Sequence, residues 1–345
     1  MEPYDLIVIG GGPAGYLAAQ RAAEKKKRVL LFEKNKLGGV CLNEGCIPTK
    51  TLLNSAKIYE HAKNGNSFGI LTENASIDPI AIQKRKNRVI HMLVGGVKMT
   101  MKKNKVKVIY QQAKIKGKKD RGFLAEAEGE IYEAKNLLIA AGSQPVILPI
   151  KGGKEAMESG LAVTSRELLD LPQLPNKLVI VGAGVIGLEM AAYFAGMGTK
   201  VTVVEMLDKI AGTMDRKITK MLQKELEKKG IQFMLGYQVT EIEKDEVVCK
   251  KEDQWIRCKA DKILWSVGRR PIIKGLGLES VNLKTENGKI VTDEHLRTSV
   301  KGIYAAGDVN GKMMLAHTAY RESETAVNDM FGIQDTIDYG CLLYT

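Results

Sequence analysis

The most constraining feature of the sequence is a glycine-rich segment that occurs twice, each time between an apolar strand and a helix of mostly small residues. In the first copy the strand at residues 4–9 leads into Gly10, Gly12 and Gly15, and the next apolar strand, 29–33, ends at Glu33. This order predicts a βαβ unit. Its glycines would allow a tight turn, the approach of backbone N–H groups to a pyrophosphate and close packing of helix on strand, and Glu33 would accept hydrogen bonds from a ribose.

The second copy runs from the strand at 177–181 through Gly182, Gly184 and Gly187 to Glu205. The distance from first glycine to acid is the same in both copies, since 33 − 10 = 23 and 205 − 182 = 23. Two such units predict two dinucleotides, one held permanently and one exchanging, because hydride chemistry needs a donor and an acceptor.

Glu205 would repel a ribose 2′-phosphate, and residues 206–208 supply no arginine to bind one. NAD is therefore favoured over NADP, with Lys209 as the only nearby basic residue.

Length and composition narrow the class of protein. A chain of 345 residues suits two domains, and its 44% hydrophobic and 27% charged residues are typical of a globular protein. The net charge of +12 is spread over short lysine runs without a nucleic-acid motif, so nucleic acid is not expected as a partner. No apolar stretch is long enough to span a bilayer, and Glu2 and Asp5 do not suit a signal peptide, so a cytoplasmic location is expected.

The close cysteine pair, Cys41 and Cys46, requires its own explanation. Residues five apart do not share one face of a regular helix, so a disulfide there would need a distorted backbone, for which Gly45 and Pro48 are suited. A strained disulfide exchanges readily, as a redox pair must.

A metal site and two buried thiols are the alternatives. The metal site would need two further ligands, and Cys249, Cys258 and His61 have no spacing typical of zinc, so no metal is predicted. A hairpin is predicted over residues 246–257, and Cys249 and Cys258 are assigned to it as packing residues. Cys341 is also interpreted as a packing residue.

The segment 38–50, Gly-Gly-Val-Cys-Leu-Asn-Glu-Gly-Cys-Ile-Pro-Thr-Lys, resembles the active-site segment of the pyridine nucleotide-disulfide oxidoreductases, in the wording typical of their dihydrolipoamide dehydrogenase branch. The resemblance extends to residues 182–189, 267–269, 302–309 and 314–317, and therefore covers nearly the whole chain.

This resemblance implies an α/β fold of two Rossmann-like, three-layer FAD/NAD(P)-binding domains, with the NAD domain inserted in the FAD domain. The expected parts are residues 1–147 and 271–345 for the FAD domain and 148–270 for the NAD domain. The residues implied for FAD are Gly10, Gly12, Gly15, Glu33, Lys50, Ala113, Gly142, Asp308 and Ala316. Those implied for NAD are Gly182, Gly184, Gly187, Glu205, Val239 and Gly268.

The resemblance also implies the chemistry. Cys41 would exchange with the dithiol substrate, Cys46 would lie next to the flavin, and Lys50 with Glu189 would form an ion pair beside it. The expected activity transfers electrons between dihydrolipoamide, carried on a lipoyl domain or carrier protein, and NAD⁺, as the E3 component of 2-oxoacid dehydrogenase complexes. Two alternatives remain: another flavin disulfide reductase, like glutathione or mercuric reductase, and a non-catalytic flavin-binding module.

The C-terminal part of the resemblance is incomplete. Members use a histidine before proline as the base that deprotonates the dithiol, and none of His61, His91, His295 and His317 precedes proline. Residues 341–345 suggest an apolar strand cut short, so the C-terminal dimerisation domain is expected to be absent from a truncated chain. The full-length protein would be a homodimer, and this chain would act poorly on lipoamide.

Overall fold

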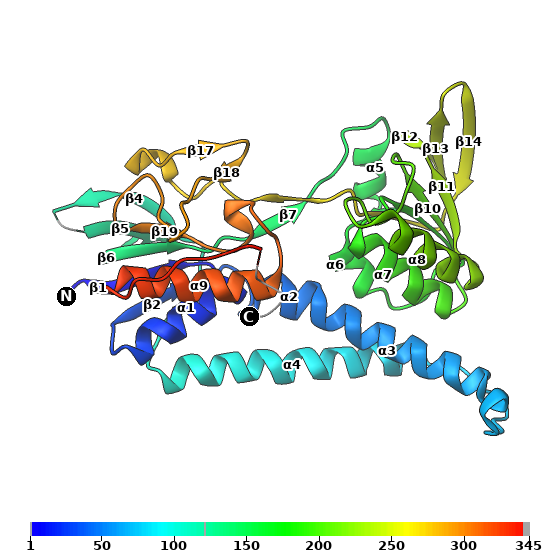
Figure 1. Ribbon diagram of the computed structural model, residues 1–345, viewed down its shortest axis with the longest axis horizontal. Helices are drawn as coiled ribbons and strands as arrows, with labels where there is room; N and C mark the ends of the chain where they lie inside the picture. The colour runs from blue at the N-terminus through cyan, green and yellow to red at the C-terminus, as the bar shows by residue number, and fades with distance from the viewer. Residues whose placement is uncertain (1, 121, 341–345) are drawn as a thin grey trace. The chain divides into compact units, whose positions relative to one another are not determined.

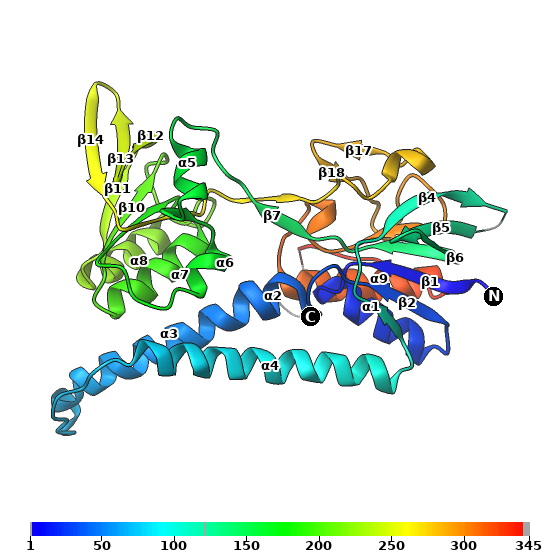
Figure 2. The same ribbon diagram turned by 180° about the vertical axis from the view of Figure 1, so that it is seen from behind.

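The computed structural model describes residues 2–120 and 122–340. The chain forms two compact units (Figures 1 and 2). The first unit comprises Met1–Asn43, His91–Gln144 and Arg270–Thr345, and the second comprises Glu44–Ile90 and Pro145–Arg269. The larger part of the second unit is thus inserted between two segments of the first. Contacts alone define these units, so the domain boundaries expected at residues 147 and 270 stay a prediction.

The first unit is built on a seven-stranded sheet in the order β3-β2-β1-β6-β5-β4, with β19 also paired to β6. Strands β3, β2, β1, β6 and β19 are parallel, whereas β5 and β4 are antiparallel to their neighbours. The strands are β1 (Tyr4–Ile9), β2 (Val29–Phe32), β3 (Lys107–Ile109), β4 (Lys114–Lys119), β5 (Gly122–Ala127), β6 (Glu130–Ile139) and β19 (Ile303–Ala305).

Alternating side chains of the central strands enter two different cores, which makes the first unit three-layered. Leu6 and Val8 pack on the face that carries α1 (Pro13–Glu24) and α9 (Ala316–Met330), which lie side by side (Figure 1). Ile7 and Ile9 pack on the opposite face, against the segment that includes Leu276 and Leu283. Short elements complete this unit: α2 (Gly39–Glu44), β7 (Ser143–Pro145), β16 (Arg269–Pro271), η2 (Leu278–Val281), β17 (Thr285–Glu286), β18 (Lys289–Ile290) and η3 (Asp308–Asn310), with α2, β7 and β16 reaching the unit boundary.

The second unit has a five-stranded parallel sheet in the order β11-β10-β9-β15-β8 and a three-stranded antiparallel sheet in the order β12-β13-β14. The parallel strands are β8 (Ala162–Val163), β9 (Lys177–Val181), β10 (Lys200–Glu205), β11 (Gln232–Leu235) and β15 (Lys262–Trp265). The antiparallel strands are β12 (Gln238–Glu243), β13 (Glu246–Lys251) and β14 (Gln254–Lys259).

The same alternation of side chains gives this unit its layers. Leu178 and Ile180 face a helical layer, and Val179 and Val181 face a core shared with the antiparallel sheet. The helices are α3 (Cys46–Lys63), η1 (Gly65–Phe68), α5 (Gly153–Glu158), α6 (Ser165–Leu169), α7 (Val185–Gly196) and α8 (Arg216–Lys228), while α4 (Pro79–Lys103) belongs partly to each unit.

The fold class expected from the sequence is confirmed, and both βαβ units occur where the glycine segments indicated them. The helix that follows the cysteine segment begins at Cys46 itself and ends at Lys63. The hairpin extends through Lys259 and so includes Cys258. Within the described part of the chain, no helix combines the length and the apolar character needed to cross a bilayer. The strand expected at 341–345, with Cys341, lies outside the described residues.

Candidate functional site

The first glycine loop follows β1 and leads into α1. Gly10 has φ +110°, and a Cβ there would lie 2.2 Å from the carbonyl oxygen of Ala140. A Cβ on Gly15 would lie 1.7 Å from the carbonyl oxygen of Gly10, so glycine is required at both positions. At Gly12, the N-cap of α1, the nearest atom to such a Cβ is Cα of Gly39 at 3.8 Å. The backbone at this helix end is therefore accessible to a ligand atom.

The first residues of α1 suit a phosphate. The helix has no capping side chain among the described residues, no acid in its first turn, and proline at its start. The N–H groups of the first turn therefore have no competing carboxylate, and the positive end of the helix dipole favours an anion. This geometry fits the pyrophosphate of a dinucleotide.

Glu33 holds the first loop in shape from the end of β2. Its Oε2 accepts a hydrogen bond of 2.8 Å from the Gly11 N–H, and its Oε1 accepts one of 2.7 Å from the Asn35 N–H. The side chain is buried at 7% exposure. The carboxylate expected to bind a ribose thus also joins the glycine loop to the neighbouring strand.

The second loop repeats this arrangement. A Cβ on Gly182, which has φ +102°, would lie 2.6 Å from the Ser266 carbonyl oxygen, and one on Gly187 would lie 2.3 Å from the Gly182 oxygen. Gly184 is the N-cap of α7, again without a capping side chain. Glu205 accepts hydrogen bonds of 2.8 Å from the Ala183 N–H and 2.9 Å from the Leu207 N–H.

The other residues implied for FAD in the first unit follow the carboxyl ends of its parallel strands, where ligands of such sheets bind. Gly142 comes after β6, Asp308 after β19, and the Ser143 hydroxyl donates a hydrogen bond to Asp308 Oδ2. Ala316 is the first residue of α9. Ala113 follows β3, but its side chain is 2% exposed, which leaves a cofactor only its backbone.

The residues implied for NAD meet at the corresponding edge of the second unit. Gly182 and Gly268 follow β9 and β15, which are neighbours in the sheet, and Gly268 has φ +116° with open space where a Cβ would lie. Val239 is different, because its side chain is 4% exposed and packs in the core with Cys249. Any contact of Val239 with a cofactor is therefore limited to its backbone.

The segment that carries Cys41 is attached to the first glycine loop. The Gly38 N–H donates a 2.8 Å hydrogen bond to the Gly11 carbonyl, and a Cβ on Gly39, with φ +55°, would lie 2.6 Å from Cα of Gly12. The Asn43 side-chain amide donates to the carbonyls of Leu37 and Gly39 at 3.0 and 2.9 Å. The start of α2, and with it Cys41, is thus fixed beside the loop suited to a dinucleotide.

Cys46 begins α3, which belongs to the second unit. Gly45 lies between α2 and α3 with φ −145° and ψ −107°, so the helical conformation stops between the two cysteines, as a disulfide between them would require. Pro48 lies in the first turn of α3, where its missing N–H leaves no hydrogen bond unmade. The pairing of the two sulfurs stays a prediction.

Lys50 and Glu189 come together within the second unit. Lys50 is on α3 and Glu189 is on α7, and the Lys50 ammonium lies 2.8 and 3.1 Å from the two Glu189 oxygens. The helices approach closely, with a Cβ on Gly196 at 3.4 Å from Cβ of Ala56. The ion pair implied by the resemblance therefore forms, and the role of these residues beside a flavin stays a prediction.

Two charged residues that the sequence did not single out belong to these sites. Glu322 on α9 is fully buried, and it accepts hydrogen bonds from the Gly307 N–H, Asn310 Nδ2 at 2.9 Å and the Tyr339 hydroxyl at 2.7 Å. Burial raises the pKa of Glu322. The carboxylate thereby positions the turn that contains Asp308, and its only sequence signal was an acid on the apolar side of a helix.

Arg216 is the second such residue. Its guanidinium lies 2.9 Å from the Asp208 carboxylate, and this pairing lowers the pKa of Asp208. An arginine is therefore close to the loop after β10, but it is bound to an acid of that loop. No group of three or more His, Cys, Asp and Glu side chains in the described part of the chain could hold a metal ion.

Comparison with known proteins identifies the family. The model for the pyridine nucleotide-disulphide oxidoreductases matches residues 4–323. The chain belongs to this family. A family member named dihydrolipoyl dehydrogenase from Acholeplasma laidlawii is 43% identical over 333 residues, which are 96% of this chain and 97% of that protein. Another of the same name, from Bacillus subtilis strain 168, is 39% identical over 347 residues, covering 96% of this chain and 72% of that protein.

Solved structures give the same family fold. The HOCl-induced flavoprotein disulfide reductase RclA from Escherichia coli superposes with a TM-score of 0.83 at 27% identity, over 98% of this chain and 73% of that one. As a member of this oxidoreductase family, the chain is an enzyme with FAD and a pyridine nucleotide, NAD(P), as cofactors. The two loops described above fit two dinucleotides.

Proposed function

We propose that this chain is a dihydrolipoamide dehydrogenase that transfers electrons between dihydrolipoamide and NAD⁺ through a Cys41–Cys46 disulfide. The observation that carries the proposal is the attachment of the Cys41 segment to the first glycine loop, through Gly38 and Gly11. A thiol at this place would lie beside the dinucleotide that we assign to the first unit. The names of the curated relatives support dihydrolipoamide as the substrate.

The roles proposed for the residues are those that the family resemblance implies. The first loop would hold FAD, which supplies two-electron chemistry between nicotinamide and disulfide when bound. Cys41 would attack or be attacked by the substrate sulfur, and Cys46 would be the thiol on the flavin side. Lys50, oriented by Glu189, would supply a positive charge near the flavin, and this preorganised charge would favour the reduced state.

Glu205 supports NAD over NADP as the exchanging cofactor. Its carboxylate is fixed by the Ala183 and Leu207 amides, and it would face a 2′-phosphate with like charge. Arg216 is engaged by Asp208. A dihydrolipoyl group on a lipoyl domain or carrier protein, a homodimer for the full-length protein and a cytoplasmic location belong to the same proposal.

The direct test is reduction of the FAD-loaded chain by NADH without oxygen, followed by alkylation. We expect a long-wavelength absorption band from thiolate and flavin on partial reduction, and loss of disulfide-reducing activity once Cys41 and Cys46 are alkylated. The Cys41→Ser and Cys46→Ser variants should lose this activity, whereas Cys258→Ser is the matched control and should retain it. Unchanged electron delivery after alkylation of both cysteines would contradict the relay.

Lys50 has a separate test. The Lys50→Met variant should bind FAD normally but reduce it more slowly with NADH, because the positive charge is gone while the helix is kept. The same half-reaction rate in both proteins would remove Lys50 from the mechanism.

Another flavin disulfide reductase activity is the second candidate, and the likeness to RclA favours it. A substrate panel distinguishes the two. Among thiol and disulfide substrates, dihydrolipoamide and lipoamide should give the highest kcat/KM if the first proposal holds. Because none of the four histidines precedes proline, we expect this chain by itself to pass electrons from NADH to small acceptors faster than it oxidises dihydrolipoamide.

A further inference from the structure

A second pair of cysteines lies on the antiparallel sheet of the second unit. Cys249 on β13 pairs in register with Ile256, and Cys258 on β14 pairs with Val247, so the two cysteines are diagonal neighbours on one face of the hairpin. Cys249 is fully buried, and Cys258 is half-buried. The Cys258 sulfur lies 3.4 Å from the Met234 sulfur on β11.

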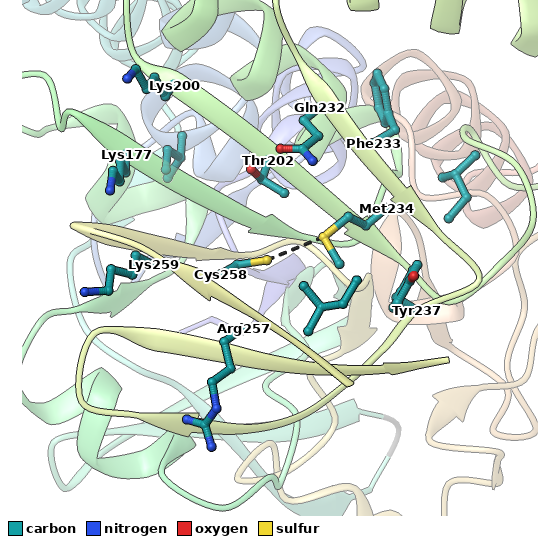
Figure 3. Close-up of a pocket in the computed structure, with 13 residues that line it drawn as sticks. Lys177, Lys200, Thr202, Gln232, Phe233, Met234, Tyr237, Arg257, Cys258 and Lys259 are labelled. Carbon is teal, nitrogen blue, oxygen red and sulfur yellow. Dashed lines mark hydrogen bonds between the residues drawn. The ribbon is translucent and has the colours of Figure 1, made fainter. Parts of the chain in front are cut away.

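Cys258 lines a pocket of about 610 Å³ between the two sheets of this unit (Figure 3). The lining includes Lys177, Lys200 and Gln232, which begin β9, β10 and β11, whereas the glycine loop begins after the carboxyl end of β9. The pocket therefore starts from the end of the sheet opposite to the proposed NAD site. A volume of this size accepts a small organic molecule.

The pocket is basic at its rim. Lys177, Lys200 and Lys259 line it, and among the described residues their ammonium groups make no ion pair or hydrogen bond. In Figure 3 the three lysines gather on one side of Cys258, whose sulfur points the other way, to Met234.

The fourth cation of the pocket, Arg257, is already bound by Glu243 at 2.6 Å and Glu246 at 3.4 Å. Asp261 lies close to the rim, because it accepts a hydrogen bond from the Lys177 N–H, but no acidic residue lines the pocket itself. A bound molecule would thus meet positive charge at the rim and sulfur and apolar side chains within.

The Cys258 thiol is also activated. The hydrogen bond from the Cys249 thiol lowers the pKa of Cys258, and the same hydrogen bond, together with burial, raises the pKa of Cys249. Of the two thiols, Cys258 therefore ionises more readily, and the thiolate is the nucleophilic form.

We propose that Cys258 is a thiolation site for small disulfides that carry carboxylates. The carboxylate binds at the lysine rim, and the Cys258 thiolate attacks the disulfide inside the pocket. One S–S bond breaks and one forms: the products are a mixed disulfide on Cys258 and one thiolate that leaves, with no net change in oxidation state. Because Cys249 is fully buried and does not line the pocket, we expect the adduct to persist on Cys258, and a free thiol in solution reverses the modification.

The test uses the FAD-loaded full chain and two coloured-product reagents, the dicarboxylate dithiobis-nitrobenzoate and the neutral dipyridyl disulfide. The rate at Cys258 is the difference between wild type and Cys258→Ser, and peptide mass mapping locates the adduct. The measured quantity is the ratio of the rate with the anionic reagent to the rate with the neutral reagent. This ratio should be at least about tenfold higher in the folded chain than in the chain unfolded in urea, as expected for electrostatic steering. An equal rate ratio in the folded and unfolded chains, or an adduct on other cysteines only, would overturn the proposal.

Charge variants locate the cause of the preference. The double variant Lys177→Gln/Lys259→Gln should slow the anionic reagent roughly tenfold and leave the neutral reagent unchanged. Lys220→Gln/Lys224→Gln on α8 is the matched control with the same change in net charge and should have no effect. Equal slowing of both reagents, or equal effects of both double variants, would contradict a binding rim. A mass loss of two hydrogens in the peptides of Cys249 and Cys258 would show an internal disulfide and contradict the stable adduct.

Discussion

The two glycine loops have nearly the same hydrogen bonds, but the helix that follows each loop is packed differently within its own unit. Each has an acid that binds the second residue of the loop, Glu33 on Gly11 and Glu205 on Ala183. Each also has a downstream N–H that donates 2.8 Å to the carbonyl of that residue, from Gly38 in one copy and Ala211 in the other. The common parts are those that any dinucleotide requires.

The difference lies in the helix that follows each loop. In the first copy Ala14 is 5% exposed, because the Ser323 hydroxyl of α9 donates a 2.7 Å hydrogen bond to its carbonyl and Gly307 packs against it. In the second copy the corresponding residues of α7 are more open: Ile186, which matches Ala14, is half-buried, and Val185 before it is 56% exposed. The first copy is thus built into its unit and the second is accessible, which suits a resident FAD and an exchanging NAD.

The largest expected effect comes from adding one methyl group to each loop. Gly15→Ala places a Cβ 1.7 Å from a backbone oxygen and should abolish FAD retention, whereas Gly187→Ala, at 2.3 Å, should keep FAD but raise the KM for NADH. Such overpacking costs roughly 1–3 kcal/mol or more. FAD absorbance after gel filtration and NADH kinetics measure both.

Gly95→Ala is the control for these variants. Gly95 lies in α4 with nothing near a Cβ, so the change should stabilise the helix by about 0.5–1 kcal/mol. If Gly187→Ala released FAD as readily as Gly15→Ala, the two loops would not have separate roles.

A charge reversal at the second acid should change cofactor choice only. Glu205→Arg removes a like charge and adds a donor, so the ratio of kcat/KM for NADH to that for NADPH should fall roughly 10- to 100-fold, the value of one hydrogen bond to a charged group. Glu205→Gln, which loses only the charge, should give a smaller change in the same direction. Bound FAD should be unaffected in both, and an unchanged ratio would show that Glu205 does not face the ribose.

The packing of α9 against the start of α1 can be weakened by removing one hydroxyl group. Ser323→Ala removes the hydrogen bond to Ala14 and should destabilise this contact by about 1 kcal/mol, so FAD should dissociate roughly fivefold faster. Flavin fluorescence on dilution follows the release. Ser55→Ala on α3 serves as the control, and equal release rates from both variants would mean that α9 does not retain the cofactor.

The smallest effect concerns pH. Burial raises the pKa of Glu322, so the protonated carboxyl contributes stability that is fully present below the usual value of about 4.3 and is lost as the pH rises through the raised pKa. The Tm of the wild type should therefore fall over that range, and the slope should disappear in Glu322→Gln. The same slope in both proteins would assign the pH dependence to other groups.

Parts of these sites could be predicted from the sequence because they depend on residues that are close together along the chain. The strands, the φ values of Gly10 and Gly182, and the break between α2 and α3 at Gly45 follow from apolar runs and from the steric limits of the backbone. The Lys50–Glu189 pair was predicted only through a family resemblance, since the residues are 139 positions apart.

Other parts were beyond the sequence. Glu322 appeared to be an ordinary helix acid until α9 packed it beneath Gly307 and Asn310. Cys249 and Cys258 were interpreted as packing residues, and only the packing of β14 beside β9, β10 and β11 placed Cys258 at a basic pocket.

The sequence by itself determined the two nucleotide loops, their acids and the position of the cysteine segment, because a turn without room for a Cβ specifies glycine locally. The tertiary structure alone decided which loop is covered, which carboxylate is buried and which thiol is activated. These properties depend on residues that are distant in the chain and meet only after the sheets have formed, so no pattern of neighbouring residues encodes them.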